Sequence, residues 1–343
     1  MGESYSKEKE DIMISGMFSI AETYGVIPDI TIDGSLLMYS GLNSTSVLEQ
    51  HSSQMVSDLV SKVPNYMTNL GSSLSAFELV PNAVGLGALI ISFLLDLTVS
   101  SLIKVPEDSP LNMMQRVFAE EKASGVRDSM DEYLKRLHKY VWEPEQALEE
   151  TRRLEKQLSE QLTRLRNSML KDGQMSSRAM KIWVNGAAFH AQMLIHEARL
   201  MMAGYGSKEE KNLDVRVASV HNMVNHYQKD LEDLLKEYKS YKRTNMHLQI
   251  EVSKCGFRYA FSCQHHMCYI YDEELGKSTR KNPRTLFHDY YEKSICHGSL
   301  DAYINYMFSN WGQIKKLSEY FTVLNTNIRE LITQNRNFTM KNV

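Results

Sequence analysis

The clearest pattern in the sequence is a series of eight apolar residues between positions 217 and 241, spaced alternately three and four residues apart. They are Val217, Val220, Val224, Tyr227, Leu231, Leu234, Tyr238 and Tyr241. This spacing places them on one face of an α-helix and is typical of long helices that pack side by side. Leu248 continues the frame, which predicts one helix from about residue 210 to 248, about 60 Å long at ~1.5 Å per residue. We call this stripe the seam, and it is a candidate surface for self-association into a homo-oligomer.

Shorter stripes with helical spacing cover most of the remaining chain. Residues 8–27 predict a first helix, residues 28–46 a loop, and residues 46–69 an amphipathic helix that Pro64 interrupts. Beyond Pro110 the pattern predicts a nearly continuous series of amphipathic helices. Their stripes run over residues 111–118, 130–141, 148–169, 182–200 and 303–331.

A single apolar run, Ala83–Ile103, differs from every other segment. It holds 21 residues with one charge, Asp96, and at ~1.5 Å per residue it would just cross a ~30 Å hydrocarbon layer. It is either the buried central helix of a bundle or a conditionally exposed membrane-inserting helix. A permanent span is disfavoured because Asp96 in hydrocarbon costs ~2.5–3.5 kcal/mol. In the folded protein we expect a buried helix over the whole run. The candidate membrane-insertion residues are Leu86, Leu89, Ile90, Ile91, Phe93, Leu94, Leu95 and Leu97.

The distribution of charge divides the chain near residue 110. Residues 11–110 carry twelve charged side chains, ten of them acidic, whereas residues 111–172 carry twenty-four, balanced between the two signs. We therefore expect a low-charge region at 1–110, a long-helix bundle at 111–250, and a third segment at 251–343 that completes the bundle. The net charge of -3 provides no general attraction to nucleic acid, so no nucleic-acid partner is expected.

All four cysteines lie between residues 255 and 296, among several histidines. Alternating aromatic residues at 257–263 and 267–271 predict a small β-hairpin near 255–272. A zinc site could use Cys263, Cys268, Cys296 and His297, but their spacing lacks the usual paired ligands. Two disulfides are a further alternative. The default expectation is reduced, metal-free cysteines packed in a small aromatic subdomain. The group His190, His196 and Glu197 is interpreted as an ordinary helix face.

Sequence motifs of the common enzyme classes are missing. The chain has no GxxxxGK[ST], strand-linked GxGxxG or GxSxG motif, and no paired carboxylates in an acid/base setting. We therefore expect a non-enzymatic protein without a cofactor. The N-terminal residues lack the apolar region of a secretory signal, which predicts a cytoplasmic protein with membrane association as a further expectation.

The order of the parts, with Ala83–Ile103 followed by the long helices of 111–248, resembles the α-helical pore-forming toxins of the cytolysin A and Cry6 type. The stretch from Val84 through Ser109-Pro110-Leu111 to Met114 and Phe118 also looks like the rapunzel family of fish proteins. The toxin resemblance implies membrane insertion. The rapunzel resemblance implies no particular activity.

We therefore predict an all-α fold, an elongated bundle of five or six long amphipathic helices around one apolar helix, with a small hairpin. The predicted function is membrane association or insertion, pore-forming-like or lipid-binding, through a conditionally exposed apolar helix. The alternative is a soluble coiled-coil scaffold whose apolar helix stays buried.

Overall fold

The predicted long helix is present as α10, Leu213–Asn245, which is unbroken across the whole seam. The computed structural model of the 343-residue chain describes residues 7–63, 74, 77, 79–118, 124–207, 211–254, 264–281 and 293–340, without the side chains of 7–10, 250–254, 264–268, 281 and 293–299. Asn212 caps α10 by accepting a hydrogen bond from the Val215 amide. The seam residues are buried, except that Val217 and Tyr241 at its ends are only partly covered. The prediction of a continuous helix from Val217 to Tyr241 is confirmed.

The predicted extension of this helix to Leu248 is wrong. The backbone becomes extended at Met246, with φ -109° and ψ 139°. Leu248 lies on strand β1, Met246–Lys254. The Asn245 side chain donates to the Tyr241 carbonyl, and the Asn245 carbonyl accepts from the Glu273 amide. These bonds end the helix and begin the pairing of β1 with β2.

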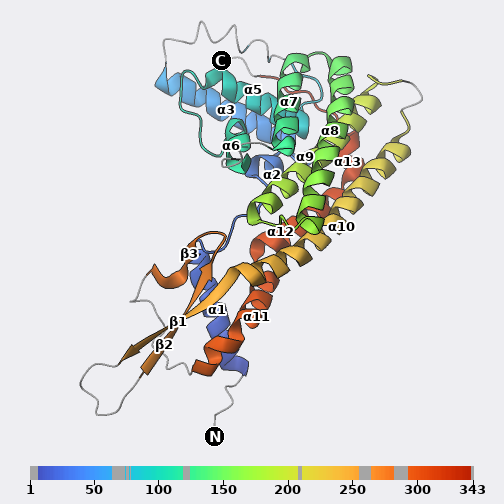
Figure 1. Ribbon diagram of the computed structural model, residues 1–343. Coiled ribbons are helices and arrows are strands. Elements are labelled where there is room, and N and C mark those ends of the chain that lie inside the picture. The colour runs from blue at the N-terminus through green and yellow to red at the C-terminus, as the bar shows by residue number, and fades with distance from the viewer. Residues whose placement is uncertain are drawn as a thin grey trace.

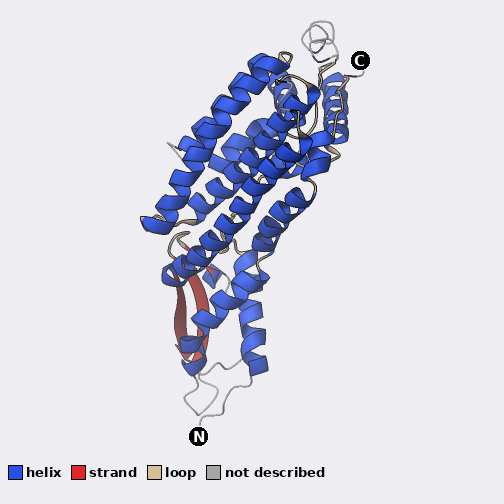
Figure 2. Ribbon diagram, turned by 90° about the vertical axis from the view of Figure 1, so that its right-hand side faces the viewer, coloured by secondary structure: helices blue, strands red, loops and turns tan. Residues whose placement is uncertain are grey.

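The fold is all-α with one small antiparallel sheet, as the sequence predicts. The molecule is elongated, with the helices running roughly along its length and the sheet at one end (Figure 2). The longest helices besides α10 are α8, Pro144–Lys171, and α9, Ser177–Ala203. The shorter helices of the first half of the chain are α1, Lys7–Thr23; α2, Gly34–Met38; α3, Ser44–Lys62; α5, Leu86–Val99; the 3-10 turn η3, Pro110–Asn112; α6, Met113–Phe118; and α7, Gly125–Tyr140.

The central helix of the bundle is α9, and not the apolar run as predicted. Twenty of the 27 residues of α9 are buried, and it packs against α8, α10, α13, α7 and α5. The apolar helix α5 lies at one end of the molecule, packed mainly against α3 (Figure 1). Because α9 carries few charges, its small and apolar residues can face neighbours on every side.

The helix within the apolar run is shorter than predicted, since α5 spans 14 residues rather than 21. Asn82 and Gly85 both have positive φ, at 56° and 52°, which prevents a helix from starting before Leu86. At the other end, the amides of Leu102 and Ile103 fold back onto the Val99 carbonyl. Hydrophobicity alone does not reveal these backbone turns.

The sheet has the order β1-β2-β3, with β2 at Gln264–Asp272 and β3 at Lys277–Ser278, followed by the 3-10 turn η5, Thr279–Lys281. Met246 pairs with Asp272, and Lys254 pairs with Gln264. The second predicted strand is therefore correct, but the first strand precedes Cys255. The residues predicted for it, 257–263, lie outside the described part of the chain.

The predicted final helix over 303–331 is wrong, because three helices occupy this region. They are α11, Lys293–Asn310; α12, Gly312–Thr326; and α13, Ile328–Thr333. The first break is at Trp311, whose backbone is extended and whose side chain is buried. The second is at Asn327, where φ is -106° and ψ is 11°. Each break redirects the apolar stripe without interrupting its spacing in the sequence.

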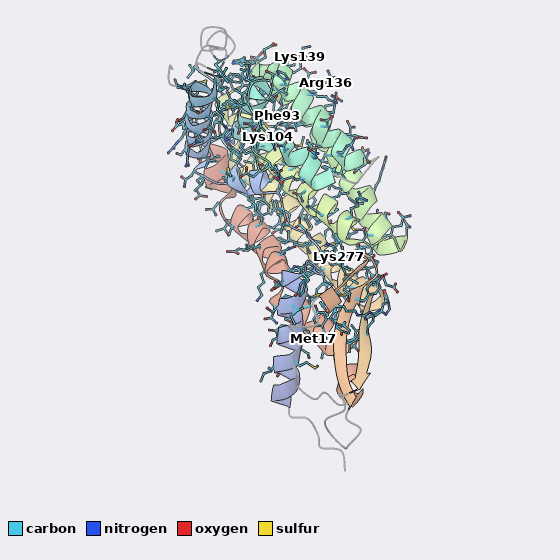
Figure 3. All side chains as sticks on the ribbon, turned by 90° about the vertical axis from the view of Figure 1, so that its left-hand side faces the viewer. Met17, Phe93, Lys104, Arg136, Lys139 and Lys277 are labelled. Atoms are coloured by element: carbon cyan, nitrogen blue, oxygen red, sulfur yellow. The ribbon has the colours of Figure 1, made fainter. Side chains whose placement is uncertain are left out.

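The two ends of the molecule contain different parts of the predicted first region. Helix α1 packs against α11 and β2 at the sheet end, whereas α3 and α5 lie at the opposite end (Figure 1). Figure 3 shows the same separation, with Met17 of α1 and Lys277 of β3 far from Phe93 of α5. Residues 1–110 thus contribute to both ends of the bundle.

Candidate functional site

Most of the candidate membrane-insertion residues are buried on α5. Phe93 is partly buried and Leu97 is 42% exposed, whereas the others face the core. The buried ones are Leu86, Leu89, Ile90, Ile91, Leu94 and Leu95. The apolar helix is therefore covered in this state of the protein, with one edge open to solvent.

The single charge of α5, Asp96, is 2% exposed and has hydrogen-bond partners on both carboxylate oxygens. His51 of α3 lies 2.8 Å away through its Nε2 atom, and the Ser109 hydroxyl donates over 2.5 Å. Two further residues extend the cluster, because Arg116 donates to the Ser109 carbonyl and to both oxygens of Asp33. We call these five residues the Asp96 network. It offsets the desolvation of the carboxylate and joins α3, α5 and the loop before α6.

The seam does not present a free surface for self-association, because the chain's own helices cover it. Helix α10 packs along α9, α12, α11 and α13. At the middle of the seam, Tyr227 packs edge-on against Trp183 and lies 2.8 Å from His190 Nδ1 through its hydroxyl. Burial raises the pKa of the Tyr227 hydroxyl, with smaller effects in the same direction from Asp230 and Glu155. The seam thus contributes to intramolecular packing.

The candidate zinc ligands fall where side chains are not described. Cys263 lies outside the described residues, Cys268 is on β2, and Cys296 and His297 are on α11. Among the described residues, no group of three or more His, Cys, Asp or Glu side chains is placed to hold a metal ion.

A buried ionic cluster lies where α10 meets the sheet. Lys242 and Asp272 are both fully buried, and the Lys242 ammonium lies 2.7 Å from Asp272 and 2.7 Å from Glu274. Glu274 also accepts hydrogen bonds from the Ser177 amide and hydroxyl at the start of α9. The cluster ties the sheet to helices α9 and α10 of the bundle.

Sequence reasoning missed a polar pair on α9. His196 and Arg199, one helical turn apart, are both buried beside the first turn of α5. Arg199 Nε and Nη2 and His196 Nδ1 have no hydrogen-bond partner among the described residues. The signal in the sequence was an arginine within one residue of the apolar stripe that contains His196 and Leu200. The site was overlooked because its partner segment is distant in the chain.

Burial lowers the pKa of His196 to about 3, and the nearby positive charge of Arg199 acts in the same direction. In the unfolded chain a histidine takes up its proton near pH 6.5, so below that pH the unfolded state binds more protons. Stability should therefore fall as pH falls from about 6.5 toward 3. At pH 5 the loss from this residue is about 2 kcal/mol relative to pH 7.

Urea unfolding at pH 7 and pH 5 tests whether this pH dependence comes from His196. The loss of stability should be about 2 kcal/mol smaller in His196→Gln than in the parent protein. His138→Gln, which changes an exposed histidine on α7, serves as the matched control. Equal losses in the parent and His196→Gln would contradict the assignment.

Comparison with protein-family models, curated proteins and solved structures finds no match for this chain. Within the described residues, no helix is both long enough and apolar enough to cross a membrane. The predicted membrane-length helix over 83–103 is thus replaced by the 14-residue α5.

Proposed function

We propose that this is a non-enzymatic helical protein that associates with the surface of membranes when α3 uncovers α5. The observation that carries the proposal is the position of α5. It has one charged residue in 14, and it lies at an end of an elongated bundle rather than in its centre (Figure 1).

The length of α5 defines the kind of association. Fourteen residues span about 21 Å, which is short of the ~30 Å hydrocarbon core. An apolar helix of this length can bury its side chains at the boundary between headgroups and acyl chains. We therefore propose insertion into one leaflet rather than a span.

Exposed basic side chains that could contact an anionic surface lie at this end, beside exposed acidic residues such as Glu107 and Asp108. One of the basic side chains, Arg136, also pairs with Glu132 over 2.7 Å. Lys104, Arg136 and Lys139 are exposed and lie at the same end of the molecule as Phe93 of α5 (Figure 3). Basic residues near an anionic membrane contribute about 1 kcal/mol each. Vesicles containing phosphatidylserine should therefore bind more strongly than neutral vesicles.

The polar contact between the middle of α3 and α5 is the His51–Asp96 pair of the Asp96 network, and Ser44 and Thr45 at the start of α3 bond the loop that precedes α5. The His51 side chain is 25% exposed, so this contact lies near the surface. Removing the Asp96 charge lowers the cost of placing α5 in lipid, and removing His51 weakens the hold of α3.

Vesicle co-sedimentation tests the proposal with Asp96→Asn and His51→Ala. Both variants should bind phosphatidylserine vesicles more strongly than the parent protein, by about tenfold or more for Asp96→Asn from the cost of the charge. The matched control is Asp58→Asn on α3, which should bind as the parent does. Asp58 is a partly buried residue, away from Asp96 of α5, whose side chain bonds Gln54. Circular dichroism confirms that each variant is folded before it is mixed with lipid.

The second candidate function is a scaffold whose apolar helix never leaves the core. It is favoured by the burial of 11 of the 14 residues of α5 and by the partners on both oxygens of Asp96. The same experiment separates the two functions. If neither the parent nor the two variants bind vesicles of either composition, membrane association is rejected and the scaffold stands.

A further inference from the structure

Arg199 is a buried cation with no ion-pair partner among the described residues. It is 3% exposed, and its Nε and Nη2 atoms have no hydrogen-bond partner in the same part of the chain. Burial lowers the pKa of the guanidinium to about 9. A buried charged group that lacks both an ion pair and hydrogen bonds is strongly unfavourable, and such groups normally have a partner.

The guanidinium lies against a second positive feature, the start of α5. Its Nη1 atom is 3.5 Å from the position that a Cβ would occupy on Gly85, the residue that precedes the helix. The N-cap residue Gly85 has no side chain that could bond to the first turn of α5, although the Gly85 amide donates to Ser44 Oγ and the Gly87 amide donates to the Val84 carbonyl. The free amide groups of a first helical turn carry partial positive charge, so the helix start and Arg199 repel each other unless an anion lies near both.

The loop that leads into α5 is held firmly in this arrangement. The Gly85 amide donates to Ser44 Oγ over 2.7 Å, and Thr45 Oγ1 donates to the Ala83 carbonyl over 2.8 Å. A Cβ on Gly87 would come within 2.5 Å of the Asn82 carbonyl oxygen and 3.5 Å of His196 Cε1. Glycine at 87 therefore allows the loop, the helix start and α9 to approach closely.

A small cavity adjoins the same first turn. It has a volume of about 30 Å³, and its lining includes Asn82, Gly87 and His196 among mostly apolar side chains, whereas Arg199 lies outside this lining. The unpartnered Nδ1 of His196 adds a polar atom on this side of the helix. A cavity of this size suits a small group rather than an extended ligand.

We propose that the start of α5, together with Arg199 and His196, is a binding site for a small phosphate-type oxyanion. The anion would accept hydrogen bonds from the guanidinium fork and from the remaining first-turn amides, those of Leu86 and Ala88, because the Gly87 amide already donates to the Val84 carbonyl. The source is either free inorganic phosphate or the terminal phosphate of a small phosphomonoester. This proposal does not rest on the proposed membrane association, and it applies to the state in which α3 covers α5.

Thermal unfolding in a phosphate-free buffer tests the site, with inorganic phosphate or glycerol 3-phosphate added at constant ionic strength. A ligand that binds only the folded protein should raise the Tm by a few °C when it is well above its Kd. A rise with phosphate alone identifies the free anion as ligand. A larger rise with glycerol 3-phosphate identifies the phosphomonoester.

Arg199→Met separates a ligand site from a merely structural arginine. It should abolish the phosphate response, and without phosphate its Tm should equal or exceed that of the parent, because an unpaired buried charge has been removed. Arg153→Met, on the exposed face of α8, should keep the full response. If Arg199→Met does not fold, Arg199→Lys should still show a phosphate affinity weakened about tenfold by calorimetry, since lysine lacks the planar fork.

The proposal is overturned if neither anion raises the Tm of the parent protein. It is also overturned if phosphate raises the Tm of Arg199→Met as much as that of the parent. The same holds if the Tm of Arg199→Met lies below that of the parent by the same amount with and without phosphate. In each case Arg199 would be a packing residue.

Discussion

Replacing Leu231 with Asp is expected to lower the free energy of unfolding by roughly 4 kcal/mol or more. Leu231 is 2% exposed, in the middle of the seam, where α10 packs against α9 and α12. The substitution removes the apolar contacts of the leucine and places a carboxylate in the interior of the bundle. Urea unfolding followed by circular dichroism measures the loss.

Val215→Asp is the control for this prediction, because it introduces the same carboxylate on the same helix. Val215 is 51% exposed and lies in the first turn of α10, where a negative charge is favoured by the helix dipole. Its effect should stay within about 0.5 kcal/mol. Comparable losses from the two variants would mean that the seam does not carry the stability of the bundle.

The elements that the sequence predicted are those whose signal is local. The seam is an uninterrupted periodicity, and the burial of its central residues in α10 follows directly from that spacing. The same holds for α8 and for the all-α class. In each case the residues that specify the element lie within the element.

The features that could not be predicted depend on contacts between distant segments. The partner of Asp96 is His51, 45 residues earlier, so nothing near Asp96 in the chain indicates that the charge in the apolar run is satisfied. Arg199 and Gly85 are more than 100 residues apart in the chain, and their approach becomes visible only in the fold. The break at Trp311 could not be predicted either, because the apolar residues keep helical spacing on both sides of it.

A second large effect is expected from Lys242→Met, which should lower the free energy of unfolding by about 3–5 kcal/mol. Methionine replaces the apolar stem of lysine, but it leaves the Asp272 carboxylate buried without its cation. Asp272 keeps one hydrogen bond, from the Leu275 amide over 3.1 Å. Most of the loss should therefore come from the uncompensated charge rather than from packing.

The double variant Lys242→Met with Asp272→Asn distinguishes these causes. The asparagine side chain can still accept from the Leu275 amide, and it carries no charge, so the double variant should recover more than half of the loss. A double variant that loses the sum of the two single effects would show that Lys242 and Asp272 do not interact energetically.

The cluster also predicts where the protein loosens. Because Lys242 and Glu274 connect α10, the turn after β2 and Ser177 of α9, Lys242→Met should increase amide hydrogen exchange in β1 and β2. The amides of α7 at the other end (Figure 1) do not depend on this joint and should keep their protection. A uniform rise along the whole chain would instead mean that the sheet and the bundle unfold as one cooperative unit.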